Sequence, residues 1–89
     1  MEKEAIQRTI KRLEDIYNKT VRYSNEESKK ILEFKTYLKN YESKPEYTQL
    51  AIDFKEAIEF SKNTCEQLHV EILDIEKEIE VLKNYLQDN

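Results

Sequence analysis

The chain of 89 residues contains no glycine and only one proline, Pro45. Glycine supplies the positive backbone φ that many tight turns require, so a chain without it has few such turns to make. This disfavours sheet folds with many hairpins, and it excludes a glycine-rich loop that cradles a phosphate group. The sequence is left with long elements and few connections between them.

Histidine and cysteine each occur once, as His69 and Cys65, and tryptophan is absent. A metal site usually needs three or four convergent ligands, and this pair lacks a third group that would orient it for nucleophilic catalysis. The carboxylates fall mostly outside the apolar stripes, which predicts a solvated acidic face. We therefore expect no catalytic site, no metal and no cofactor. A lone cysteine also favours a reducing, cytoplasmic location.

Long apolar runs and a strong charge of one sign are missing as well. No stretch of roughly 18 apolar residues occurs, so we expect no membrane insertion. The formal net charge is −4, from 15 basic and 19 acidic side chains. A basic stripe is absent, so we expect no nucleic-acid partner. The charged start Met1–Glu4 has no apolar stretch behind it, so no secretory signal is expected.

Apolar residues recur at alternating steps of four and three along two stretches, and this 3.5-residue repeat is typical of a coiled-coil seam. The first stretch comprises Ile6, Ile10, Leu13, Tyr17, Thr20, Ser24, Glu27, Ile31, Phe34, Leu38 and Tyr41. The second comprises Tyr47, Ala51, Phe54, Ile58, Ser61, Cys65, Leu68, Ile72, Ile75, Ile79, Leu82 and Leu86. We predict an all-α fold with helices at about residues 2–42 and 45–87.

The segment between the stretches predicts a turn at about residues 42–45. Ser43 and Glu46 fit a capping box, with Pro45 in the first turn of the second helix. A short loop makes the helices antiparallel, so facing residues have numbers with a constant sum. From Tyr41/Tyr47 to Ile6/Leu82, eleven layers sum to 88 or 89. The sequence predicts one domain over residues 1–89, a long antiparallel two-helix hairpin of coiled-coil type.

Two further features bear on this hairpin. Ser24–Glu27 also fits a capping box, so the first helix could break near Ser24, which would give three helices. The apolar repeat keeps its phase through Ser24, and this favours one unbroken helix. Residues 1–42 carry a charge balance of +2 and residues 43–89 one of −6. In this register Ser24 faces Cys65, and three exposed ion pairs are expected to flank the seam, namely Arg12–Glu78, Lys19–Glu71 and Lys11–Glu76.

Apolar residues outside the seam gather on one flank of the predicted hairpin. They are Ile16, Tyr23 and Tyr37 on the first helix and Leu50, Ala57, Phe60, Val81 and Tyr85 on the second. An exposed strip of this length is larger than a soluble monomer usually tolerates, and a two-helix core is thin. We expect a protein partner or a second copy to cover these residues and complete a three- or four-helix bundle.

These features indicate a non-catalytic protein–protein interaction module, a small helical adaptor, accessory or chaperone-type protein. Two alternatives stay open. One is a structural homo-oligomer, for example a dimeric four-helix bundle. The other is a small phage or mobile-element inhibitor that blocks a host protein with its acidic second helix.

The segment Ile10–Leu13 and the bend Lys44–Tyr47 lie in a hairpin that resembles tubulin cofactor A and prefoldin-type hairpins over the two helices. The short third helix of cofactor A has no counterpart here. In size and shape the chain is also similar to the helical accessory proteins of type VII secretion, but their Trp-x-Gly turn is absent. The resemblance implies the hairpin shape, and no functional residue is carried over from either group.

Overall fold

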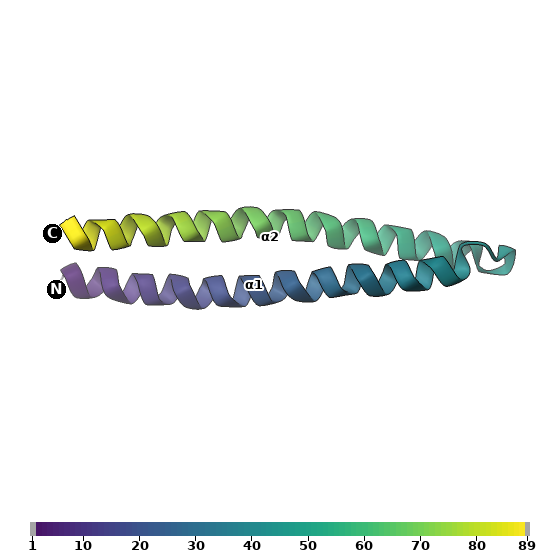
Figure 1. Ribbon diagram of the computed structural model, residues 1–89, viewed down its shortest axis with the longest axis horizontal. Coiled ribbons are helices and arrows are strands. Elements are labelled where there is room, and N and C mark those ends of the chain that lie inside the picture. Colours follow the sequence, from purple (N-terminus) through teal and green to yellow (C-terminus); the bar gives the residue numbers. More distant parts are fainter. Residues whose placement is uncertain (1, 89) are drawn as a thin grey trace.

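Two long helices lie side by side and form a rod in the computed structural model, which describes residues 2–88 (Figure 1). Helix α1 spans Glu2–Tyr41, the 3-10 turn η1 spans Pro45–Tyr47, and helix α2 spans Thr48–Asp88. Both ends of the described chain lie at one end of the rod and the turn lies at the other. The rod measures 67 × 15 × 14 Å. The predicted all-α hairpin is confirmed, and α1 continues through Ser24 without a break.

The two helices meet along the predicted seam. All eleven seam positions of α1 are buried or half-buried, and so are eleven of the twelve on the second stretch. The exception is Tyr47, which is 40% exposed because it lies in the turn rather than between the helices. The ring centroids of Phe34 and Phe54 are 6.2 Å apart, as the predicted register requires. The repeat therefore identified the contact surface correctly.

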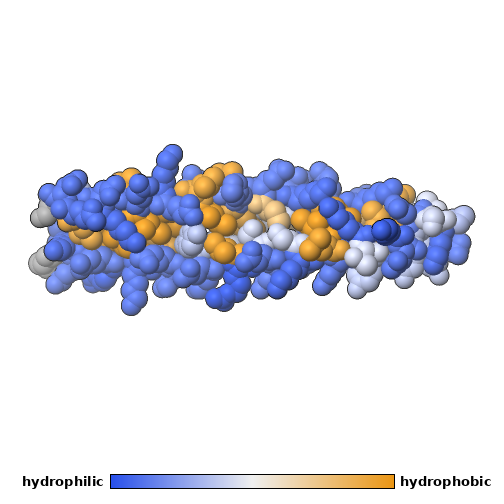
Figure 2. Space-filling model, in the orientation of Figure 1, coloured by the Kyte–Doolittle hydropathy of each residue, from blue (hydrophilic) through white to orange (hydrophobic). Residues whose placement is uncertain are grey.

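The core between the helices is thin. Among the described residues, the buried ones are Ile10, Glu27, Ala51, Ile58, Ser61 and Leu68, and none of the large side chains is completely buried. Figure 2 shows one face of the rod, where apolar surface follows the line between the helices and is bordered by hydrophilic side chains. A helix pair has no further layer of structure to cover the outer edges of its seam, so these edges stay in contact with water.

The middle of the seam is polar. Glu27 is only 4% exposed and Ser61 only 3%. The buried carboxylate of Glu27 has a partner, because Lys30 Nζ donates to its Oε1 at 3.1 Å. Cys65 Sγ lies 3.8 Å from Ser28 Oγ. This contact joins the half-buried Cys65 to a residue one turn further along α1 than Ser24, which the register places opposite Cys65.

The turn differs from its prediction in one respect. Lys44, not Ser43, caps η1, and it does so with an extended backbone and without a side-chain hydrogen bond, so the capping box was wrong. Pro45 forces the residue before it out of the helical region, which moves the cap to Lys44. The amide N–H of Lys44 donates to Tyr41 O at 3.1 Å. No described residue has positive φ, so the turn needs no glycine.

An aromatic cluster closes the turn end of the rod. The rings of Tyr41 and Tyr47 meet edge to face with centroids 5.0 Å apart. The Lys44 ammonium lies 5.6 Å from the Tyr41 centroid and 5.9 Å from that of Tyr47. Tyr37 stacks on Phe54 at 5.5 Å. Such ring and cation–π contacts stabilise this end beyond the area they bury.

The predicted ion pairs across the seam do not form. Between residues 2 and 88, Lys30–Glu27 is the ion pair that lies within 4.0 Å. Within these residues, no ion pair forms at the three predicted positions, Arg12–Glu78, Lys19–Glu71 and Lys11–Glu76. Glu76 instead accepts a hydrogen bond from the Tyr17 hydroxyl at 3.0 Å. Long exposed side chains lose conformational entropy when they pair, and water solvates them almost as well. Charge pairing therefore contributes little to this register.

Candidate partner-binding surface

The eight apolar residues singled out above share one position relative to the seam. Each immediately precedes a seam residue, as Ile16 precedes Tyr17 and Phe60 precedes Ser61. One residue along a helix turns the side chain by about 100°, so these positions lie on the same side of the seam on their helix. We call this set the interaction flank: Ile16, Tyr23, Tyr37, Leu50, Ala57, Phe60, Val81 and Tyr85.

The antiparallel arrangement brings the two halves of the interaction flank to one side of the rod. Tyr23 of α1 and Thr64 of α2 both precede seam residues, and both line one shallow hollow between the helices. At the free end, Tyr85 Oη donates to Glu2 Oε1 at 3.0 Å and so links this side of α2 to α1. The flank is therefore one continuous side of the rod, formed by both helices.

Most of the interaction flank is open to solvent. Phe60 is 72% exposed and Val81 is 64% exposed, although both are large and apolar. Ile16, Tyr23, Tyr37, Leu50 and Tyr85 are also exposed, whereas Ala57 is half-buried beside the seam. Of the twelve large apolar side chains that the described chain exposes, seven belong to this flank. Exposed apolar side chains that gather on one side mark an association surface more often than scattered ones do.

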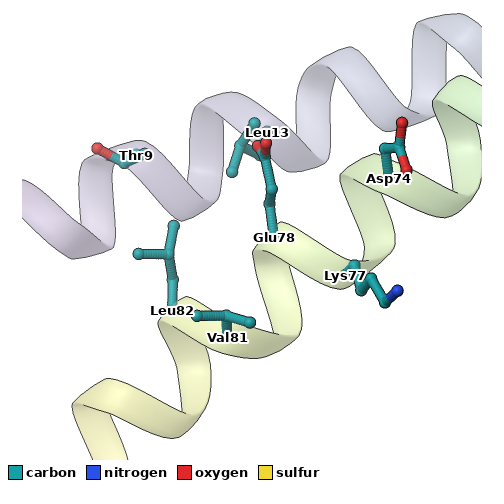
Figure 3. Close-up of a pocket in the computed structure, with 7 residues that line it drawn as sticks. All are labelled: Thr9, Leu13, Asp74, Lys77, Glu78, Val81 and Leu82. Carbon is teal, nitrogen blue, oxygen red and sulfur yellow. The ribbon is translucent and has the colours of Figure 1, made fainter.

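The free-end half of the flank is hollowed. Thr9 and Leu13 of α1 and Val81 and Leu82 of α2 line the hollow, with the charged residues Asp74, Lys77 and Glu78 around them (Figure 3). In this view Val81 and Leu82 lie next to each other on α2, and the side chain of Glu78 extends toward Leu13. The surface of this open hollow is mostly apolar, although three of its seven lining residues are charged.

The two helices give the flank different charges. The α2 positions that precede seam residues include Asp53, Glu71, Asp74 and Glu78 but no Lys or Arg. The corresponding α1 positions nearest the free end include Arg12 and Lys19, whereas the turn half of α1 contributes Glu26, Lys30 and Glu33. A partner that covers the flank therefore meets an acidic edge along α2 and a basic stretch along the free-end half of α1.

The opposite side of the rod also exposes apolar residues, which the sequence analysis did not single out. Leu32, Ile52 and Leu73 each follow a seam residue and are exposed. Val70 is 57% exposed on the outer side of α2. These four residues are fewer and further apart than those of the interaction flank. For Leu32, Ile52 and Leu73, the position directly after a seam residue is a sequence signal that could have identified them.

Three pKa values depart from their usual range in the same direction. The Glu76 carboxylate, which accepts the hydrogen bond of Tyr17, raises the pKa of Tyr17, and Glu2 raises the pKa of Tyr85 in the same way. The hydrogen bond to Glu27 raises the pKa of Lys30. In each case a nearby carboxylate favours the protonated partner. All three groups titrate in the alkaline range, so none of them provides an acid or base at neutral pH.

Neither a cluster of metal-ligating side chains nor a segment that could span a membrane occurs among the described residues. Residues 2–88 contain no group of three or more His, Cys, Asp or Glu side chains placed to hold a metal ion. Neither helix, as far as it is described, has a segment apolar enough over a sufficient length to cross a membrane. Comparisons with protein families, with curated proteins and with solved structures find no match to this chain.

Proposed function

We propose that this chain is a non-catalytic protein–protein interaction module, a small helical adaptor or chaperone-type protein that binds its partner through the interaction flank. The observation that carries this proposal is the gathering of seven exposed large apolar side chains on one side of a thin rod. Water disfavours such a surface, and covering it with a further helix would add the layer that the seam lacks.

The charges of the flank and the single cysteine support a protein partner and a cytoplasmic location. The flank has no continuous basic stripe, which favours a protein over a nucleic acid as the partner. Cys65 is the one cysteine of the sequence, and its thiol is free. A free thiol suits a reducing compartment, so we place the activity of this module in the cytoplasm.

Affinity capture with matched variants tests the proposal. The tagged chain, Phe60→Glu and the control Leu32→Glu are each used to retrieve proteins, including untagged copies of the chain, from cells of the native host. Phe60 and Leu32 are 72% and 65% exposed but lie on opposite sides of the rod. We expect the wild type and Leu32→Glu to retain the same protein and Phe60→Glu to lose it. Equal retention by all three would refute a role for the flank.

A further inference from the structure

The interaction flank has the dimensions of a stable interface. The rod is 67 Å long and 15 Å wide. One long side therefore projects roughly 1,000 Å², and a standard stable interface buries about 800 Å² on each partner. A flank this long needs an occupant of similar length, because a short helix would leave one of its two ends uncovered. Another rod of the same length fulfils that condition.

We propose that the occupant of the interaction flank is a second copy of this chain, packed face to face with its turn at the same end of the dimer. This inference rests on the proposed function and names the partner of the same surface. The two-fold axis then runs along the rod, and α1 of each copy lies over α2 of the other. The product is a four-helix bundle in which every helix is antiparallel to its neighbours.

Symmetry fixes the register of this dimer. An axis along the rod allows no slip, so residues at the same height in one copy also meet across the interface. Tyr37 and Leu50 lie at the same height in the hairpin, so Tyr37 faces the partner's Leu50. Tyr23 lies within about 8 Å of the height of the partner's Phe60. Tyr37 and the partner's Leu50 therefore cover each other, whereas Tyr23 and the partner's Phe60 differ in height by more than one helical turn.

The charges favour the same orientation. Arg12 lies at the height of the partner's Glu78, and Lys19 at the height of the partner's Glu71. In the reversed orientation α2 would lie over the partner's α2, and the acidic residues along its edge would face one another with no basic residue between them. Glu33 faces the partner's Asp53, which is a like-charged contact, but Lys30 lies one turn from Glu33 and offsets it.

Sedimentation equilibrium tests the stoichiometry. At micromolar concentration we expect a mass of twice the 10.8 kDa of one chain. Phe60→Glu should raise the dissociation constant by at least about tenfold, because the carboxylate would lose water at the interface. The control Leu32→Glu should leave it unchanged, and circular dichroism confirms that both variants stay helical. A monomer at all these concentrations, or a dimer insensitive to Phe60→Glu, overturns the inference.

Charge reversal tests which helix lies over which. Lys19→Glu and Glu71→Lys should each weaken the dimer, and the double variant should restore it, because Lys19 of each copy pairs with the partner's Glu71 and the dimer contains two such pairs. If Lys19→Glu weakens the dimer and the added Glu71→Lys weakens it further, α1 does not lie over the partner's α2. That outcome refutes the orientation.

Spin labels test the orientation directly. In a Cys65→Ser background, a label on an Asn84→Cys variant is placed near the free end of each copy. We expect a label-to-label distance well below half of the 67 Å rod length. A distance close to the full length overturns the parallel arrangement. If the chain is a monomer and yet captures a different protein through Phe60, the dimer is wrong while the proposed function holds.

Discussion

Ile58 offers the sharpest test of how the seam stabilises this hairpin, because it is a large aliphatic residue of which only 7% is exposed. The register confirmed by the Phe34–Phe54 ring contact places it opposite Ile31, between the polar middle and the aromatic turn end. Its substitution by alanine removes apolar contact from the seam and introduces no polar group. The variant therefore isolates the contribution of apolar burial.

The magnitude follows from the size of the group removed. Ile58→Ala deletes three carbon atoms, and each buried methylene contributes about 0.8 kcal/mol, so the transfer contribution alone is about 2.4 kcal/mol. A rigid cavity would add to this, up to a total of about 5 kcal/mol. Here the facing Ile31 is only half-buried, so water and neighbouring side chains can fill part of the space. We expect a loss of about 2–3 kcal/mol in the free energy of unfolding.

Urea denaturation followed by circular dichroism measures this loss. A small protein has a slope of about 1–3 kcal/mol per molar urea, so the midpoint should fall by roughly 1 M or more. All variants are compared at one protein concentration, because self-association would also stabilise the folded state. Val70→Ala is the control, since Val70 is 57% exposed on the outer side of α2. Its cost should stay below about 0.5 kcal/mol.

The comparison of Ile58→Ala with Val70→Ala tests whether burial in the seam stabilises the rod. If Val70→Ala cost as much as Ile58→Ala, burial in the seam would not be what determines the stability of the rod, because alanine has the higher helix propensity in both cases. The reasoning would then be refuted, because both substitutions replace a β-branched residue within the same helix and differ mainly in burial.

Three further substitutions test other parts of the structure. Glu27→Leu should raise the urea midpoint by an amount equivalent to about 1 kcal/mol, because an apolar side chain replaces a buried carboxylate that must be desolvated. Phe54→Ala should cost about 3–4 kcal/mol in the same assay, since its ring contacts those of Phe34, Tyr37 and Tyr41. Tyr17→Phe should make the stability fall less steeply as the pH rises in the alkaline range. The pKa of Tyr17 is raised in the folded state, so the Tyr17 hydroxyl stabilises the fold fully below its ordinary pKa of 10.0. This stabilisation is lost as the pH rises through the folded-state pKa. Thermal melts between about pH 8 and 12 measure this difference.

Each of these expectations has a contrary outcome. A destabilised Glu27→Leu variant would show that the polar layer contributes net stability. A small loss for Phe54→Ala would show that the ring cluster can rearrange around a smaller side chain. If the wild type and Tyr17→Phe lost stability in parallel as the pH rises, the hydrogen bond between Tyr17 and Glu76 would not be formed in solution.

The fold of this chain is encoded locally and repeatedly, and for that reason it could be predicted. The repeat of apolar residues over two stretches sets which side of each helix is buried, and the single break around Pro45 sets where the chain reverses. The mirror symmetry of the two stretches then allows one register for an intramolecular pairing. An independent structural quantity, the Phe34–Phe54 ring contact, agrees with that register.

Details that depend on three-dimensional competition could not be predicted. The predicted register places both Lys11 and Tyr17 near Glu76. In the structure it is the hydroxyl of the half-buried Tyr17 that donates a hydrogen bond to Glu76. The contact of Cys65 with Ser28, one turn beyond the facing residue Ser24, is likewise not indicated by the sequence pattern. The capping residue Lys44 was set by the steric demand of the following proline.

The sequence by itself therefore determined the helices, their pairing and the side on which apolar residues gather, since all three follow from periodicity along a rod. The tertiary structure alone decided which of those side chains remain exposed and which are partly covered, as Phe60 and Ala57 show. Exposure depends on the distance between the two helix axes and on the size of the facing residue. Neither quantity is a property of one residue or of its neighbours in the chain.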